Sequence, residues 1–110
     1  MGADAQVALA AAVDRMWVQY LPLTEERVLA LETAAKAFAE DHLSIEQHEA
    51  AQSAAHKLAG TLGTFGLTRG TVLARGLEIM YSRQNGPDPA LAGRMAEIAA
   101  ELRTIIASRK

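Results

Sequence analysis

Apolar residues recur at steps of three and four along most of this chain, and this spacing constrains the fold more than any other feature. Near the C-terminus the steps are four, three, four and three, over Leu91, Met95, Ile98, Leu102 and Ile105. Such spacing places side chains on one face of an α-helix, whereas a half-buried strand would show alternation. Alanine and leucine dominate and aromatic residues make up 5% of the chain. We therefore predict an all-α fold.

Proline and capping residues divide the first half of the chain. We predict a first helix over about residues 4–21 that stops near Pro22, because proline lacks the N–H that would continue it. A second helix should begin at Thr24 as its N-cap and fray around residues 41–43. Its apolar face would hold the residues spaced three, four and three apart, namely Val28, Leu31, Ala35 and Phe38.

The second half of the chain contains three more predicted helices. Ser44 should cap a helix over about residues 45–64, with Gly66 closing it in the left-handed conformation. Thr68 is the expected N-cap of the next helix, which would end in residues 84–86. Asp88 should cap the last one, with Pro89 in the first helical position, where a missing N–H matters little.

Short connections between helices favour antiparallel neighbours. The last four predicted helices should therefore form an up-and-down antiparallel four-helix bundle. The first would be an additional N-terminal helix that covers one end or side of it. A chain of 110 residues can bury one core but not two, so we predict a single domain over residues 1–110.

The composition excludes several classes of function. With 13 acidic and 11 basic residues the net charge is -2, so no general basic field attracts nucleic acid. The absence of cysteine excludes disulfides and thiolate chemistry and fits a reducing compartment. The longest apolar run, residues 7–13, is far below the roughly 20 residues of a membrane span. We expect a cytoplasmic protein that binds neither nucleic acid nor a membrane.

His56 stands out because its helical neighbours are small. At about 100° per residue, Gly60 and Gly63 fall within about 40° of His56, while Leu58 and Leu62 fall on the far side. Together the two glycines lower local helix stability by about 2 kcal/mol. Either they let another helix approach closely, or they clear a surface for a macromolecule. The second reading gives a docking surface of Gln52, Ser53, Ala59, Gly60 and Gly63.

The run from His56 to Gly66 resembles the signature of histidine phosphotransfer (HPt) domains, commonly H-x-L-K-G-x-x-x-x-x-G. His56, Leu58, Gly60 and Gly66 stand at the matching positions. The lysine that is frequent three residues after the histidine is replaced by Ala59. The predicted helices agree with the family, so the resemblance extends over most of the chain and is most specific in this run and in residues 73–78.

The resemblance implies that His56 reversibly accepts a phosphoryl group from an aspartyl phosphate of a receiver domain and passes it to another receiver. Response-regulator receiver domains and a sensor or hybrid histidine kinase are the implied partners. This chain should need no cofactor, because the receiver would bring the Mg²⁺. Lys57 is a candidate for supporting the phosphoryl charge, although it can also be an ordinary solvated lysine. Arg69 and Arg75 are further candidates.

Other classes are less well supported. We find no Ser/His/Asp arrangement and no Gly-rich phosphate loop, so independent kinase or hydrolase activity is not expected. The main rival is a non-catalytic adaptor with the same fold, which docks a receiver or kinase without carrying phosphate. We expect a monomer. A metal site would have to draw on side chains that lack the His-Glu-x-x-His spacing: His42, Glu46, His48, Glu49 and His56.

Overall fold

The computed structural model describes residues 2–83 and 86–109, and this part of the chain is helical throughout except for its connections. Its elements are α1 (Gly2–Ala39), α2 (Ile45–Thr64), α3 (Thr68–Tyr81), the short 3-10 helix η1 (Pro89–Leu91) and α4 (Ala92–Ser108). No strand occurs in these ranges. The predicted all-α fold is confirmed.

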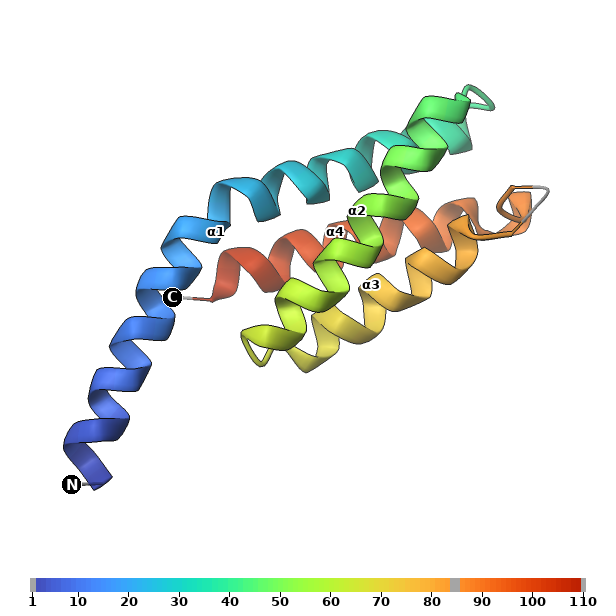
Figure 1. The fold of residues 1–110 in the computed structure, drawn as a ribbon. Coiled ribbons are helices and arrows are strands. Elements are labelled where there is room, and N and C mark those ends of the chain that lie inside the picture. Colours follow the sequence, from blue (N-terminus) through green and yellow to red (C-terminus); the bar gives the residue numbers. More distant parts are fainter. Residues whose placement is uncertain (1, 84–85, 110) are drawn as a thin grey trace.

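The four α-helices form an up-and-down bundle (Figure 1). Helix α1 packs against α2 and α4, and α3 packs against the same two helices. The centre of the bundle contains a fully buried leucine from each helix: Leu31, Leu58, Leu77 and Leu102. The seam predicted in α4 is also correct, because Met95, Ile98 and Leu102 are buried and Leu91 and Ile105 pack partly buried against the core.

The predicted break at Pro22 is wrong, because α1 runs through it as one helix of 38 residues. Thr24 is not an N-cap but a buried residue of the helix interior, whose hydroxyl donates to the Tyr20 carbonyl at 2.8 Å. A proline removes one hydrogen bond and crowds the preceding turn, which a helix can absorb by bending. Figure 1 shows such a bend between the N-terminal part of α1 and the part in the bundle.

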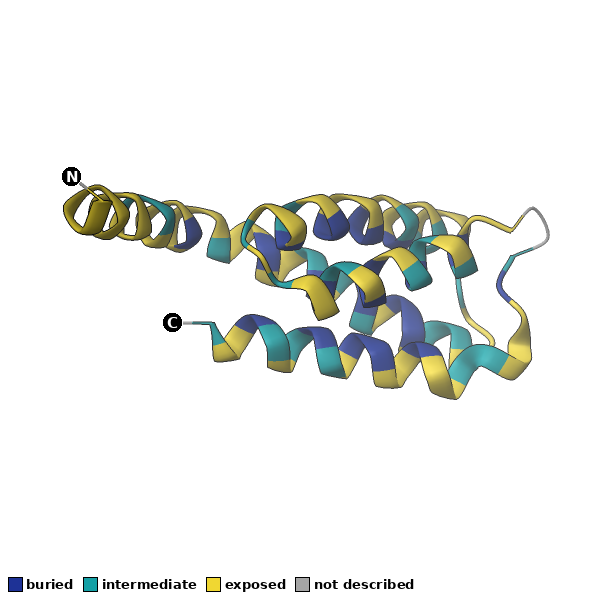
Figure 2. Ribbon diagram, turned by 90° about the horizontal axis from the view of Figure 1, so that it is seen from below, coloured by how far each residue is buried: buried dark blue, intermediate teal, exposed yellow. Residues whose placement is uncertain are grey.

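The N-terminal part of α1 does not cover the bundle as predicted. Residues 2–11 are all exposed and project beyond the other helices (Figure 2). We call these residues the N-terminal arm. Contact with the bundle is established at Trp17, which is 2% exposed and packs edge-on against Phe65 with ring centroids 5.1 Å apart. Arg109 lies over the same Trp17 ring at 5.0 Å, so the C-terminus of α4 holds α1 at its bend.

The predicted ends of α2 are confirmed. Ser44 accepts from the Gln47 amide, and the Gln47 side chain accepts from the Ser44 amide, both at 3.0 Å, which forms a capping box. At the other end Gly66 has φ 74°, and the amides of Gly66 and Leu67 donate to carbonyls of the last turn of α2. This is the glycine-closed Schellman arrangement, and it turns the chain directly into α3.

The remaining helix caps agree with the prediction only in part. Thr68 is the first residue of α3, and the N-cap is Leu67, which makes no side-chain cap bond. Asp88 does act as an N-cap, with its carboxylate accepting from the Ala90 amide, but the turn that it opens with Pro89 is η1 rather than α4 itself. Helix α3 ends at Tyr81. Of its predicted C-terminal segment, Gln84 and Asn85 lie outside the described residues.

Two polar side chains of the bundle have raised pKa values. Arg103 of α4 makes two hydrogen bonds of 2.7 Å to Glu32 of α1, and these bonds raise the pKa of Arg103. Tyr81 is 1% exposed, and burial raises the pKa of its phenol to about 12. The guanidinium therefore stays charged and the phenol neutral at ordinary pH.

Candidate functional site

His56 lies near the middle of α2, on the face that points away from the core. Its side chain is 73% exposed, whereas Ala55 and Leu58 are fully buried on the opposite face. The amphipathic pattern of α2 explains this placement, because burial of one apolar stripe turns the other face outward. The prediction that the His56 side chain is exposed is therefore confirmed.

Glu78 of α3 orients the His56 imidazole. Its carboxylate Oε2 lies 2.7 Å from His56 Nδ1, a short distance that is typical of a charge-assisted hydrogen bond. An ionised carboxylate can only accept, so this contact assigns the ring proton to Nδ1. In the neutral imidazole, Nε2 then carries the free lone pair. The imidazole is held by one nitrogen and available at the other.

The sequence did not single out Glu78 as a site residue. It lies in the run of residues 73–78 that resembles the HPt family, directly after the buried Leu77. The one indication in the sequence is that Glu78 directly follows a core position of α3, which places its carboxylate close to the packed face of that helix. Its contact with His56 also depends on how α3 is rotated against α2, and the pattern of α2 alone carries no information on that rotation.

The predicted docking surface is only partly exposed. Ser53, Gly60 and Gly63 are exposed and Gln52 is half-buried, but Ala59 is 4% exposed and belongs to the core. The reason is that α3 covers this side of α2, with the Thr71 hydroxyl donating to the Ala59 carbonyl at 3.3 Å. Ala59 therefore offers no side chain to a partner, and this member of the predicted surface is incorrect.

The two glycines beside His56 differ. A Cβ added to Gly60 would meet nothing within 4 Å among the described residues, so this glycine does not serve close helix packing. A Cβ on Gly63 would lie 3.4 Å from the Thr71 hydroxyl of α3. This is an ordinary van der Waals distance, so close helix packing does not require a glycine at position 63 either. Gly63 lies beside α3, while Gly60 leaves open space next to the histidine.

That open space belongs to a groove between α1 and α2. One side of the groove comes from α2, including His56, Lys57 and Gly60, and from its C-cap residue Phe65, and the other side comes from α1. The α1 wall consists of Met16, Tyr20 and Arg27. We call this the His56 groove. It combines apolar side chains, two cations and the exposed imidazole, a composition suited to a protein partner that carries an anionic group.

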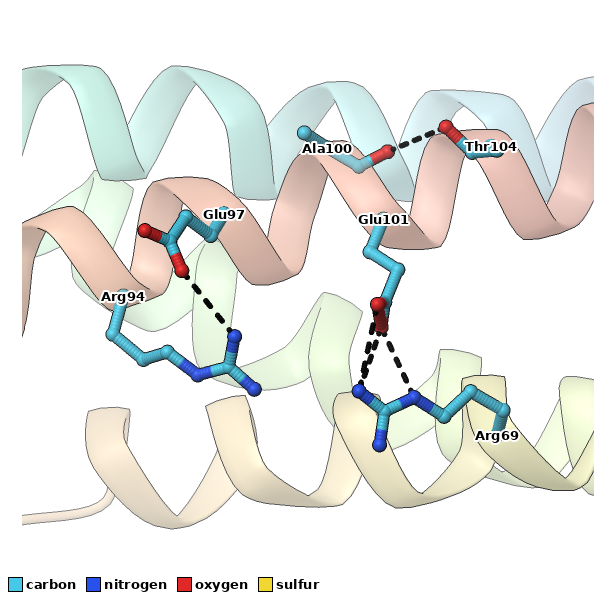
Figure 3. A network of polar contacts seen from close by, with 6 residues as sticks. All are labelled: Arg69, Arg94, Glu97, Ala100, Glu101 and Thr104. Atoms are coloured by element: carbon cyan, nitrogen blue, oxygen red, sulfur yellow. Dashed lines mark hydrogen bonds and ion pairs between the residues drawn. The ribbon is translucent and has the colours of Figure 1, made fainter.

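The candidate cations named from the sequence lie in different places. Lys57 is exposed and lines the His56 groove. Arg69 points toward α4, where its guanidinium pairs with Glu101 at 3.1 Å (Figure 3). Arg75 is exposed on α3. Arg27, which lines the groove from α1, was missed because 29 positions separate it from His56 and only the bundle brings the two together.

Metal and membrane sites find no support in the described part of the chain. Residues 2–83 and 86–109 contain no group of three or more histidine, aspartate or glutamate side chains placed to hold a metal ion. The Nε2 atom of His48 is instead hydrogen-bonded to the Tyr81 carbonyl. Within the same ranges, no helix combines the length and the apolar character that crossing a membrane requires.

Comparison with known proteins identifies the family of the chain. A relative, the protein RcaC of Microchaete diplosiphon, is 31% identical over 99 residues, which make up 90% of this chain and 15% of RcaC. The chain thus spans a small part of that protein. No solved structure matches. The model of the Hpt domain family matches residues 15–108, from just before Trp17 to the end of α4. This match covers most of the chain and includes His56, its groove and Glu78, so the chain belongs to the Hpt domain family.

Proposed function

We propose that His56 is the phosphoacceptor of a two-component phosphorelay, taking a phosphoryl group from a receiver-domain aspartyl phosphate and passing it to another receiver. The observation that carries this proposal is that, in the described structure, the His56 imidazole is hydrogen-bonded through Nδ1 and not through Nε2. Nδ1 is engaged by Glu78 at 2.7 Å, and Nε2 belongs to a side chain that is 73% exposed. Membership in the Hpt family supports the same role.

The chemistry requires little from this chain. The Nε2 lone pair attacks phosphorus, an N–P bond forms, and the P–O bond to the aspartate breaks, so that the carboxylate leaves with the electron pair. Nδ1 keeps its proton throughout. The positive charge that develops on the ring is shared with Glu78 through that proton, and transfer to the second receiver reverses the steps.

The partners in this proposal are response-regulator receiver domains and a sensor or hybrid histidine kinase. The receiver would supply the aspartate and the Mg²⁺ that neutralises the transferred oxygens, which is why phosphoryl transfer here depends mainly on positioning. The docking surface would comprise the exposed residues around His56, including Ser53, Gly60 and Gly63. Open space at Gly60 lets the receiver backbone approach Nε2.

The direct test is transfer from a phosphorylated receiver. We expect acid-labile label on the wild-type chain and none on His56→Gln. His42→Gln is the matched control, because His42 is also exposed but lies in the connection between α1 and α2; it should be labelled normally. Label on His56→Gln would contradict the assignment. A chain that binds receivers equally well before and after His56→Gln, without ever taking label, would be the non-catalytic adaptor.

A further inference from the structure

Phosphorylation of His56 would add negative charge to a position that already has a carboxylate on one side. Glu78 lies on the α3 side of the imidazole. Ala59, which replaces the frequent lysine of the family, is buried and uncharged. Arg75 of α3 lines neither hollow at His56, so the cations that line open space beside the imidazole come from the opposite side, the His56 groove.

The His56 groove holds two cations from different helices. Arg27 of α1 and Lys57 of α2 both line it, and both also line the neighbouring hollow along the same pair of helices. Among the described residues, neither forms an ion pair within 4.0 Å, whereas Arg69 and Arg103 are each paired with a glutamate. Glu26 lines the neighbouring hollow but not the His56 groove. The groove itself thus has two like charges and no carboxylate in its lining, which favours an anionic ligand there.

Arg27 is held loosely in this position. It is half-buried, and its one hydrogen bond to a side chain in the described part of the chain runs from Nη1 to the Thr61 hydroxyl at 3.3 Å. That is long for an N–H donor to oxygen. A guanidinium has five N–H donors in a planar fork that matches phosphate oxygens. Exchanging the Thr61 contact for a phosphoryl oxygen would give a shorter, charge-assisted bond.

We infer that Arg27, assisted by Lys57, binds the oxygens of the phosphoryl group on His56 Nε2 and so takes over the charge support that Ala59 does not provide. This inference rests on the proposed function of His56. Its consequence is a longer-lived phosphohistidine. In a loose transition state for hydrolysis the N–P bond breaks and its electron pair returns to the cationic ring, which lowers the negative charge on the phosphoryl group. A cation at the phosphoryl oxygens therefore stabilises the phosphohistidine more than this transition state.

The test uses phosphoramidate as a small phosphodonor, so no cognate receiver is needed. In this reaction the N–P bond of the donor breaks with loss of ammonia while the bond to Nε2 forms. After removal of the donor, ³¹P NMR follows the decay of phosphohistidine on wild type, Arg27→Gln, Arg27→Lys and Lys57→Gln. Arg69→Gln is the matched control, because that arginine is committed to Glu101. Arg27→Gln should shorten the half-life about two- to fivefold, the range of an exposed ion pair.

Thr61→Val separates charge support from a structural link between α1 and α2. It removes the partner of Arg27 but keeps the guanidinium, so the half-life should equal or exceed that of wild type, and Arg27→Lys should restore part of the loss. Equal half-lives for Arg27→Gln, Arg69→Gln and wild type would overturn the inference. A loss that Thr61→Val reproduces would do the same. If wild type takes no phosphoryl group on His56, the proposed function fails instead.

Discussion

At the scale of single residues, the decisive contact is the one between His56 and Glu78. In the proposed reaction the carboxylate would fix which imidazole nitrogen is protonated and would stabilise the positive charge that the ring gains when Nε2 attacks phosphorus. We predict that Glu78→Gln slows phosphorylation of His56 by phosphoramidate about two- to tenfold, the range of one hydrogen bond. An amide is neutral and can present either an oxygen or an NH₂ group to Nδ1, so it does not hold a single tautomer.

Glu49→Gln is the control for this prediction. Glu49 lines the same hollow as His56 and Glu78 but makes no hydrogen bond to the imidazole in the described structure. It should leave the rate unchanged. If Glu78→Gln and Glu49→Gln slow the reaction to the same extent, Glu78 acts only through the local charge. No change in either variant would remove Glu78 from the site.

The same residues show how far the sequence could predict the site. The exposure of His56 follows from the apolar stripe of a single helix, and it is correct. The burial of Ala59 and the contacts of Glu78 and Arg27 depend on which faces α3 and α1 turn toward α2. A helical wheel gives directions within one helix only, so it assigned Ala59 to the surface and could not find the other two.

At the scale of helices, two glycines with the same local disadvantage have opposite effects on packing. Gly70 of α3 is buried, and an added Cβ would lie 2.8 Å from Leu62 Cδ1 and 3.5 Å from Ile105 Cγ2. Gly60 faces open space. We predict that Gly70→Ala lowers the free energy of unfolding by about 1–3 kcal/mol through overpacking. Gly60→Ala should raise it by up to about 1 kcal/mol through helix propensity.

Urea denaturation of the two variants beside wild type measures both changes. Leu62 is fully buried, so its side chain has little room to move away from a new methyl group on Gly70. If the two variants have the same free energy of unfolding, α2 and α3 can move slightly apart without destabilising the bundle. In that case the close approach at Gly70 would not determine the relative position of His56 and Glu78.

Helix boundaries were predictable where a side chain or a glycine makes the cap. Ser44, Gly66 and Asp88 act locally, so their residue types identify the turns. Pro22 did not end its helix because burial of Trp17 before it and Val28 after it keeps both segments packed on the bundle. A single lost hydrogen bond is a smaller effect than burying two large apolar side chains, and the spacing of α1 alone does not show that both are buried.

At the scale of the whole molecule, the bundle separates the two kinds of charge around the imidazole. Helix α3 brings the carboxylate of Glu78 to Nδ1, while α1 brings Arg27 and α2 itself brings Lys57 to the His56 groove. The ring thus lies between a carboxylate at Nδ1 and a groove lined by two cations, which are the proposed donors to a phosphoryl group. Both arrangements depend on α2 being packed by α1 and α3 at once, so the site is a property of the bundle rather than of α2.

The stability of that bundle should not depend on the N-terminal arm. Residues 2–11 are exposed throughout, and the family match begins only at residue 15. We predict that deleting residues 2–11 changes the free energy of unfolding by less than about 0.5 kcal/mol, as for surface changes generally. Trp17→Ala should lower it by about 3–5 kcal/mol, as expected for a buried aromatic side chain. Thermal and urea unfolding at two protein concentrations measure both. A large loss on deletion that disappears on dilution would reveal self-association through the arm, whereas a loss independent of concentration would mean that the arm folds back onto its own bundle.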